Sequence, residues 1–161
     1  MEELLTLAHG FPQRSVAAGA ALLTDGESVG TLYVLLEGAL RVEKAGQLIA
    51  TVTEPGACVG EMSLLLGIPA TADVVAGEQS VLAVIENAQT MLEQNVDLPL
   101  ALARLLAARL HVMTTYLADI KQQYADHEGG LGMVDVVLGS LMRSSGNRSA
   151  LGSERDPDPE Y

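Results

Sequence analysis

The segment Gly60-Glu61-Met62-Ser63 combines residue types that could bind an anion at the start of a short helix. Gly60 lets the backbone approach a ligand without a Cβ in the way. The N–H groups that open the predicted helical turn over residues 62–65 would point at an anion and stabilise it through the helix dipole. Ser63 could donate its hydroxyl. Glu61 has a structural alternative, because a carboxylate at a helix start can satisfy local N–H groups.

Strands separated by glycine turns are predicted on both sides of this segment. Glycine at the corners supplies the positive φ that tight turns require. The corners recur at about the 8–12-residue spacing of a small all-β barrel or roll, and they are Ala18-Gly19, Asp25-Gly26, Glu37-Gly38, Ala45-Gly46 and Pro55-Gly56. The strand-like runs are Leu32 to Leu36, Ala39 to Glu43, Leu48 to Thr53, Ala72 to Ala76 and Val81 to Ile85. The sequence therefore predicts a mainly β structure over residues 11–86.

Helices are predicted at both ends of this β-rich part. Residues 1–10 have the pattern of a short amphipathic helix. Asn87 is the predicted N-cap of a helix that ends near residue 94. Asp97 is the predicted cap of a second helix, which runs without a breaker to about residue 126.

The long helix carries an apolar stripe with alternating spacings of four and three residues. This heptad pattern lasts about three repeats, as in a two-stranded coiled coil, and its members are Leu106, Leu110, Met113, Leu117, Ile120, Tyr124 and His127. The pattern favours a parallel homodimer through residues 102–127. An alternative stays open, in which the helix packs its stripe along its own β-roll, although this leaves the continuation into Lys121-Gln122-Gln123 unexplained.

The C-terminal part is predicted to hold a hinge, a short helix and a disordered tail. The hinge is Glu128-Gly129-Gly130. Apolar residues at helical spacing then predict a short amphipathic helix within residues 128–142. Residues 143–161 are rich in Ser, Gly, Pro and charge, so we expect them to be disordered.

Charge and motifs exclude several classes of function. The chain of 161 residues carries nine Lys and Arg against 21 Asp and Glu, a net charge of −12. Nucleic acids and anionic membranes attract proteins through Lys and Arg, so we expect neither as a partner. The sequence holds no apolar window of about 18 residues that could cross a bilayer. It also holds no HxH, CxxC, GxSxG or P-loop pattern, so we expect no catalytic residues and no metal site.

The single cysteine favours a reducing compartment. Cys58 cannot form an internal disulfide, which suits a reducing cytoplasm. We expect Cys58 to be a small core residue rather than a reactive thiol. The N-terminus begins acidic, unlike a secretory signal peptide. A cytoplasmic protein is therefore expected.

In their order, these features resemble the cyclic-nucleotide-binding domains of the catabolite-activator/FNR type. The resemblance rests on GEMSLLLGIPATADV at residues 60–74, on the preceding LYVLLEGALRV and on the long helix, and it covers about residues 11–127. It implies a mainly β fold with α, in which a jelly-roll-like cyclic-nucleotide-binding β-roll is followed by a long C-terminal dimerisation helix. The implied division is the roll with flanking short helices at 1–96, the dimerisation helix at 97–127, the short amphipathic helix at 128–142 and the disordered tail at 143–161.

The resemblance also implies roles for individual residues. Glu61 would accept a hydrogen bond from a ribose 2′-hydroxyl. Thr114 would lie where the family presents hydroxyls to the purine, although an ordinary position beside the heptad stripe is equally open. Ala70 stands where the family has an arginine, which clamps the cyclic phosphate through bidentate hydrogen bonds. The remaining residues implied to contact ligand are Gly60, Met62, Ser63 and Thr71.

The alanine at position 70 weakens the expected binding. A hydrogen bond to a charged group contributes about 1.5–3 kcal/mol, so its loss lowers affinity roughly tenfold to several hundredfold. No Lys or Arg occurs between Lys44 and Arg104. A replacement cation would have to come from a partner subunit or from one of five side chains, Arg14, Arg41, Lys44, Arg104 and Arg109.

Two functions stay open at this point. The first is a stand-alone regulatory domain that senses cAMP, cGMP or a related anion, needs no other cofactor, and signals through its C-terminal helices to a partner protein. The second is a ligand-free pseudo-sensor that serves as a homodimeric interaction or scaffold module. About 34 residues follow His127, too few for the winged helix-turn-helix of the family, so we do not expect transcription-factor activity.

Overall fold

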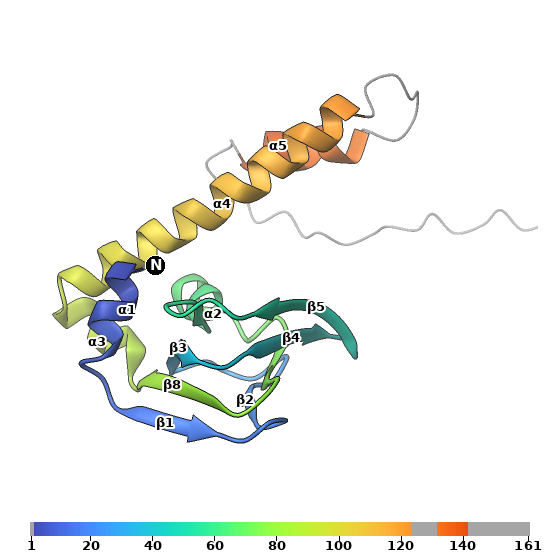
Figure 1. Cartoon of the computed structure of the whole chain (residues 1–161). Coiled ribbons are helices and arrows are strands. Elements are labelled where there is room, and N and C mark those ends of the chain that lie inside the picture. Colours follow the sequence, from blue (N-terminus) through green and yellow to red (C-terminus); the bar gives the residue numbers. More distant parts are fainter. Residues whose placement is uncertain (1, 124–131, 142–161) are drawn as a thin grey trace, which may run out of the picture. The chain divides into compact units, whose positions relative to one another are not determined.

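Two four-stranded antiparallel sheets form the β-roll in the computed structural model, which describes residues 2–123 and 132–141 (Figure 1). The first sheet has the order β1-β8-β3-β6, with bounds Gln13–Val16, Ser80–Ile85, Leu32–Glu37 and Cys58–Val59. The second has the order β2-β7-β4-β5, with bounds Ala21–Leu23, Asp73–Ala76, Leu40–Lys44 and Gln47–Val52. Together with the long helix that follows the roll, this confirms the predicted fold class.

Five of these strands agree with the sequence-based prediction to within one residue at each end, namely β3, β4, β5, β7 and β8. The strands β1, β2 and β6 were not predicted. They are four, three and two residues long, and their extended conformation follows from pairing with longer neighbours rather than from an alternating pattern of their own.

The corner between β3 and β4 passes the chain from the first sheet to the second. Gly38 occupies this corner with a φ of +95°, and a Cβ built there would lie 2.4 Å from Ser80 Oγ. Ser80 is fully buried, and its hydroxyl donates to the carbonyl of Glu78 at 2.9 Å. The corner thus needs glycine both for its backbone conformation and for the close approach of β8.

Helices cover the outer face of the first sheet. The helices α1 (Glu2–Ala8) and α3 (Ala88–Gln94) lie beside the first turns of α4 (Asp97–Gln123) (Figure 1). Their buried side chains join the sheet in one apolar cluster, which includes Leu4, Ala8, Leu32, Val34, Cys58, Ile85, Leu98 and Leu102. A second cluster contains residues of both sheets, Leu35, Leu40, Val59, Val74 and Leu82. Burial of these aliphatic groups is the main stabilising contribution of the roll.

The structure places Asn87 at the predicted N-cap position of α3 and corrects the predicted cap of α4. Asn87 precedes α3 in the left-handed conformation with a φ of 48°, and its side chain makes no capping hydrogen bond. Before α4, the capping acceptor is Asn95 rather than Asp97. The Asn95 Oδ1 accepts the backbone N–H groups of Asp97 at 3.0 Å and Leu98 at 2.9 Å. An Asn two residues before the first helical turn competes for this position because its amide oxygen can reach forward to those N–H groups.

The chain divides into two units, residues 1–109 and 110–161, and α4 runs through the boundary. In the second unit, Lys121 forms an ion pair with Asp135 of the helix α5, which spans Gly132–Leu141. The predicted hinge at 128–130 and tail at 143–161 lie outside the described residues, as do Tyr124 and His127.

The heptad stripe of α4 can be followed as far as Ile120. Leu110 and Met113 are exposed, with 45% and 58% of their surface accessible, whereas Leu117 and Ile120 are partly buried.

Within the described part of the chain, none of the helices has the length and apolar character needed to cross a membrane.

Candidate nucleotide site

An ion pair between a buried carboxylate and a partly exposed guanidinium lies at the start of α2 (Glu61–Leu66). The Glu61 side chain is 5% exposed, and its Oε1 accepts a hydrogen bond from Arg109 Nη1 at 2.5 Å. Arg109 Nη2 donates to the backbone carbonyl of Cys58 at 2.9 Å. We call residues 60–71 the cassette. One guanidinium on α4 therefore bonds both to the Glu61 carboxylate of the cassette and to strand β6, which precedes it.

Burial dominates the electrostatics of this pair. It raises the pKa of Glu61 above its ordinary value, whereas the charge and hydrogen bond of Arg109 and a backbone hydrogen bond within Glu61 itself oppose the rise. Because burial penalises the charged form, Glu61 needs a donor or a cation at its oxygens.

Cys58 contacts this pair through its backbone carbonyl, and its thiol is not reactive. Its thiol is buried, and that burial, together with the charge of Glu61, raises the pKa of the thiol far above its ordinary value. The thiolate is the reactive form of cysteine, so Cys58 is an inert core residue, as predicted.

Gly60 is required by packing within the fold. Its φ is +93°, and a Cβ there would lie 3.0 Å from the carbonyl oxygen of Thr31 and 3.3 Å from a methyl group of Val29. Glycine therefore lets the start of α2 pack against residues 29–31. That Gly60 also leaves room for a ligand stays a prediction.

Ala70 and Thr71 lie on a loop that is held from two sides. Ala70 is buried; its N–H donates to the carbonyl of Glu27, and its own carbonyl accepts the N–H of Gly26, both at 2.8 Å. Thr71 is exposed, and its carbonyl accepts a hydrogen bond from Lys44 Nζ. The position at which the resemblance implies an arginine is thus ordered by its backbone.

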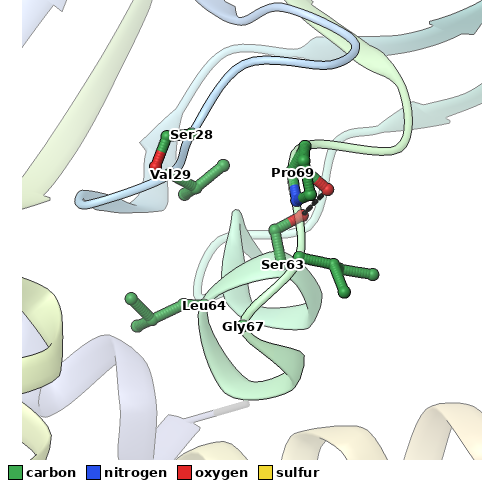
Figure 2. Close-up of a pocket in the computed structure, with 7 residues that line it drawn as sticks. Ser28, Val29, Ser63, Leu64, Gly67 and Pro69 are labelled. Carbon is green, nitrogen blue, oxygen red and sulfur yellow. Dashed lines mark hydrogen bonds between the residues drawn. The ribbon is translucent and has the colours of Figure 1, made fainter.

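Met62 and Ser63 face different environments. The Met62 side chain is 53% exposed. Ser63 is buried, and its hydroxyl donates to the carbonyl of Pro69 at 3.2 Å, which joins α2 to the loop of Ala70 (Figure 2). A pocket of about 240 Å³ lies between α2 and the loop of residues 28–29, and it is lined by Ser28, Val29, Ser63, Leu64, Gly67, Ile68 and Pro69 (Figure 2). Of the residues predicted to bind ligand, Ser63 alone is among those that line this pocket.

Six of the seven predicted site residues belong to the first unit and are connected through the Ser63–Pro69 contact. Thr114 belongs to the second unit, and its Oγ1 donates to the Leu110 carbonyl one turn earlier at 2.8 Å. Among the described residues no group of three or more His, Cys, Asp or Glu could hold a metal ion.

Two side chains that contact the cassette were predicted only as candidate cations. Arg109 lies 48 residues from Glu61 in sequence, and Lys44 lies 27 residues from Thr71. No local motif connects partners so far apart. The available signal was the absence of any Lys or Arg between residues 44 and 104. That gap ends at Lys44 and Arg104, so it points to Lys44 but not to Arg109.

The family model described as "Cyclic nucleotide-binding domain" matches residues 13–93, just over half of the chain. The chain therefore belongs to the cyclic nucleotide-binding domain family. No curated protein sequence matches it.

Solved structures agree on the fold. A catabolite activator protein of Thermus thermophilus has a TM-score of 0.58 and 21% identity over 86% of this chain and 76% of that one. A cyclic nucleotide-binding domain of Methylobacillus flagellatus KT has a TM-score of 0.52 and 23% identity over 80% and 84%. The N-terminal domain of a transcriptional regulator of Streptomyces coelicolor A3(2) has 0.51 and 26% over 72% and 85%. Other matched structures are longer, and the chain spans 39% of one and 32% of another.

Proposed function

We propose that the chain is a regulatory domain that senses cAMP, cGMP or a related anion and signals through its C-terminal helices to a partner protein. The observation that carries this proposal is the buried carboxylate of Glu61, paired with Arg109 at the start of α2. The proposed action is reversible binding and not catalysis. The single buried cysteine supports a reducing cytoplasm as its compartment.

Stability alone does not account for a buried charge at Glu61. Moving a carboxylate out of water is unfavourable, and apolar residues of similar volume often stabilise a protein as well as or better than a buried ion pair. Buried carboxylates with raised pKa values are frequent at functional sites. A ribose 2′-hydroxyl is a donor of the kind that Glu61 can accept, and the family resemblance assigns that role to this glutamate.

Arg109 offers a route from the ligand to α4. A hydroxyl that donates to Glu61 shares the carboxylate with the guanidinium, so the strength of the Glu61–Arg109 contact differs between the free and bound states. Such a difference in contacts is what allows a ligand to shift a conformational equilibrium. Because Arg109 also bonds to the Cys58 carbonyl, a movement of its guanidinium would change the position of β6 as well as that of α4.

The sharpest test of this proposal compares cAMP with 2′-deoxy-cAMP by calorimetric titration. Wild type should bind cAMP weakly, in the high micromolar range, and the deoxy analogue about tenfold more weakly, because a hydrogen bond to a charged acceptor is lost. Glu61→Ala should bind both equally. Glu54→Ala, which removes an exposed acid outside the site, should keep the preference. Equal affinities in wild type, or no binding of cAMP at millimolar concentration, would contradict the proposal.

A second function is favoured by the uncharged side chain at position 70. Ala70 is buried and carries no charge that could bind a phosphate, which favours a ligand-free pseudo-sensor that serves as a homodimeric scaffold. The exposed Leu110 and Met113 on α4 support a homodimer in either case, since water-exposed apolar stripes favour association.

The dimer has its own test in sedimentation velocity. Wild type should sediment as a dimer and Leu117→Glu as a monomer, because a charge within the heptad stripe disfavours pairing of the two helices. Ala118→Glu, which introduces the same charge at an exposed position of the same helix outside the stripe, serves as the control. A monomeric wild type would contradict the proposed dimer. A Leu117→Glu variant that stays dimeric would contradict the heptad stripe as its interface.

A further inference from the structure

We infer that Lys44, at the end of β4, binds the phosphate of the ligand in place of the arginine that is missing at position 70. This inference rests on the proposed function and adds a residue to the same site. It follows from where the cations of the first unit lie, from the contact that Lys44 makes, and from the charges around it.

Most cations of the first unit are engaged away from the cassette, which comprises residues 60–71. Arg14 lies 3.9 Å from Glu86 and Arg41 lies 3.2 Å from Glu43. Arg104 makes two hydrogen bonds to the carboxylate of Glu3, at 2.6 and 2.8 Å. Among residues 2–109, the cations with a described contact to the cassette are therefore Lys44 and Arg109.

Arg109 already has an anionic partner. Its Nη1 bonds to the carboxylate of Glu61 and its Nη2 to the Cys58 carbonyl. A phosphate at this guanidinium would compete with a buried carboxylate that cannot turn to water instead, since Glu61 is 5% exposed. Leaving that charge without its partner is strongly unfavourable, so the phosphate needs a second cation.

Lys44 lies beside the position of the missing arginine. Its Nζ donates to the carbonyl of Thr71, the residue that follows Ala70. The register of the sheet fixes this placement, because Glu43 of β4 pairs with Asp73 of β7. The side chain of Lys44 is 55% exposed. An ammonium group has three donors, so it can keep the Thr71 contact and still donate to a phosphate oxygen.

The acids near Lys44 limit the strength of this interaction. Asp25 Oδ2 is 3.9 Å from Nζ, and Asp73 Oδ1 accepts the backbone N–H of Asp25 at 2.9 Å. Both carboxylates repel an incoming phosphate. Lysine is also a compact point charge without the bidentate geometry of arginine. We therefore expect Lys44 to give weak binding that is sensitive to salt.

The test uses titration of cAMP and of adenosine, which lacks the phosphate, into the full chain. Lys44→Gln should weaken cAMP binding by about fivefold or more, as expected for a partly exposed charge-assisted contact, and should change adenosine binding by less than twofold. Arg41→Gln, on the same strand and paired with Glu43, is the matched control and should change neither. Lys44→Arg should retain or tighten cAMP binding and should keep its dependence on salt.

Each outcome separates this inference from the function on which it rests. Wild-type affinity for cAMP in Lys44→Gln would overturn the role of Lys44 and leave the function standing. An equal loss for cAMP and adenosine would overturn it too, because it would mean that Lys44 only fastens the loops of Asp25 and Thr71. If Lys44→Gln does not fold, a salt-independent cAMP affinity in Lys44→Arg overturns the inference. Failure of wild type to bind cAMP at all would refute the function itself.

Discussion

Replacing Arg109 with methionine should destabilise the fold by about 2–4 kcal/mol at pH 8, the largest single effect that we expect. Removal of one partner from a buried ion pair typically costs about 3–5 kcal/mol, and the lower range applies here because Arg109 itself is 38% exposed. Methionine preserves most of the aliphatic length, so the change isolates the charge and its two hydrogen bonds. Urea unfolding followed by circular dichroism measures the effect.

The loss should depend on pH in a defined direction. Burial already raises the pKa of Glu61 above its ordinary value of 4.5, and Arg109 opposes the rise, so the variant has a still higher pKa in the folded state. Between pH 4.5 and that value the folded state binds more protons than the unfolded state, and stability then falls as pH rises. The deficit of the variant should be small near pH 4 and grow toward pH 8.

Arg104→Met is the matched control for this prediction. Arg104 lies on the same helix, and its partner Glu3 is exposed, with 45% of its side chain accessible. Exposed pairs contribute about 0–1 kcal/mol, so this variant should remain close to wild type and show little change with pH. Equal losses in the two variants, or an Arg109→Met deficit that does not vary with pH, would contradict the role given to Glu61.

The second large effect is a gain of binding in Ala70→Arg. An arginine there should restore the bidentate phosphate contact of the family and tighten cAMP binding at least tenfold, from the about 1.5–3 kcal/mol that a charge-assisted bond contributes. The backbone of Ala70 is held by Glu27 and Gly26, so the new side chain would start from an ordered position. Calorimetric titration of cAMP into wild type and Ala70→Arg measures the gain.

A double variant shows whether this gain arises in the expected site. Glu61→Ala in the Ala70→Arg background should reverse much of it, because the ribose hydroxyl loses its acceptor. Submicromolar binding by wild type would mean that Lys44 or another cation already supplies all of the affinity that the arginine would give. Absence of any gain in a folded Ala70→Arg would mean that the site has closed around the buried Ala70, and the dimeric scaffold would then be the better account.

Much of the fold was predictable because local residue types determine it. Glycine corners and runs of branched apolar residues located β3, β4, β5, β7 and β8, since each is long enough to show its own pattern. The two-residue strand β6 has no such pattern. It is extended because Val34 and Tyr33 of β3 pair with it, and a partner more than twenty residues away leaves no local mark on the sequence.

The site was predictable in its location and less so in its contacts. The order of residues around Glu61 and Pro69 located the cassette, because the turn and the short helix are local structures. The Glu61–Arg109 pair depends on how α4 packs against the roll through residues such as Leu102 and Leu105, which spacing along the chain does not determine. The cap of α4 was misassigned for a related reason, because Asp97 and Asn95 are both good caps and only the backbone decides between them.

Amide chemical-shift mapping of the ¹⁵N-labelled chain with millimolar cAMP tests the central claim most directly, because it reports the site even when binding is weak. The account predicts that the largest shifts fall on residues 60–71, with further shifts at Cys58, Arg109 and Lys44, and that adenosine leaves Lys44 and Thr71 unchanged. A spectrum that does not change with cAMP, or shifts confined to residues remote from Glu61, would contradict it.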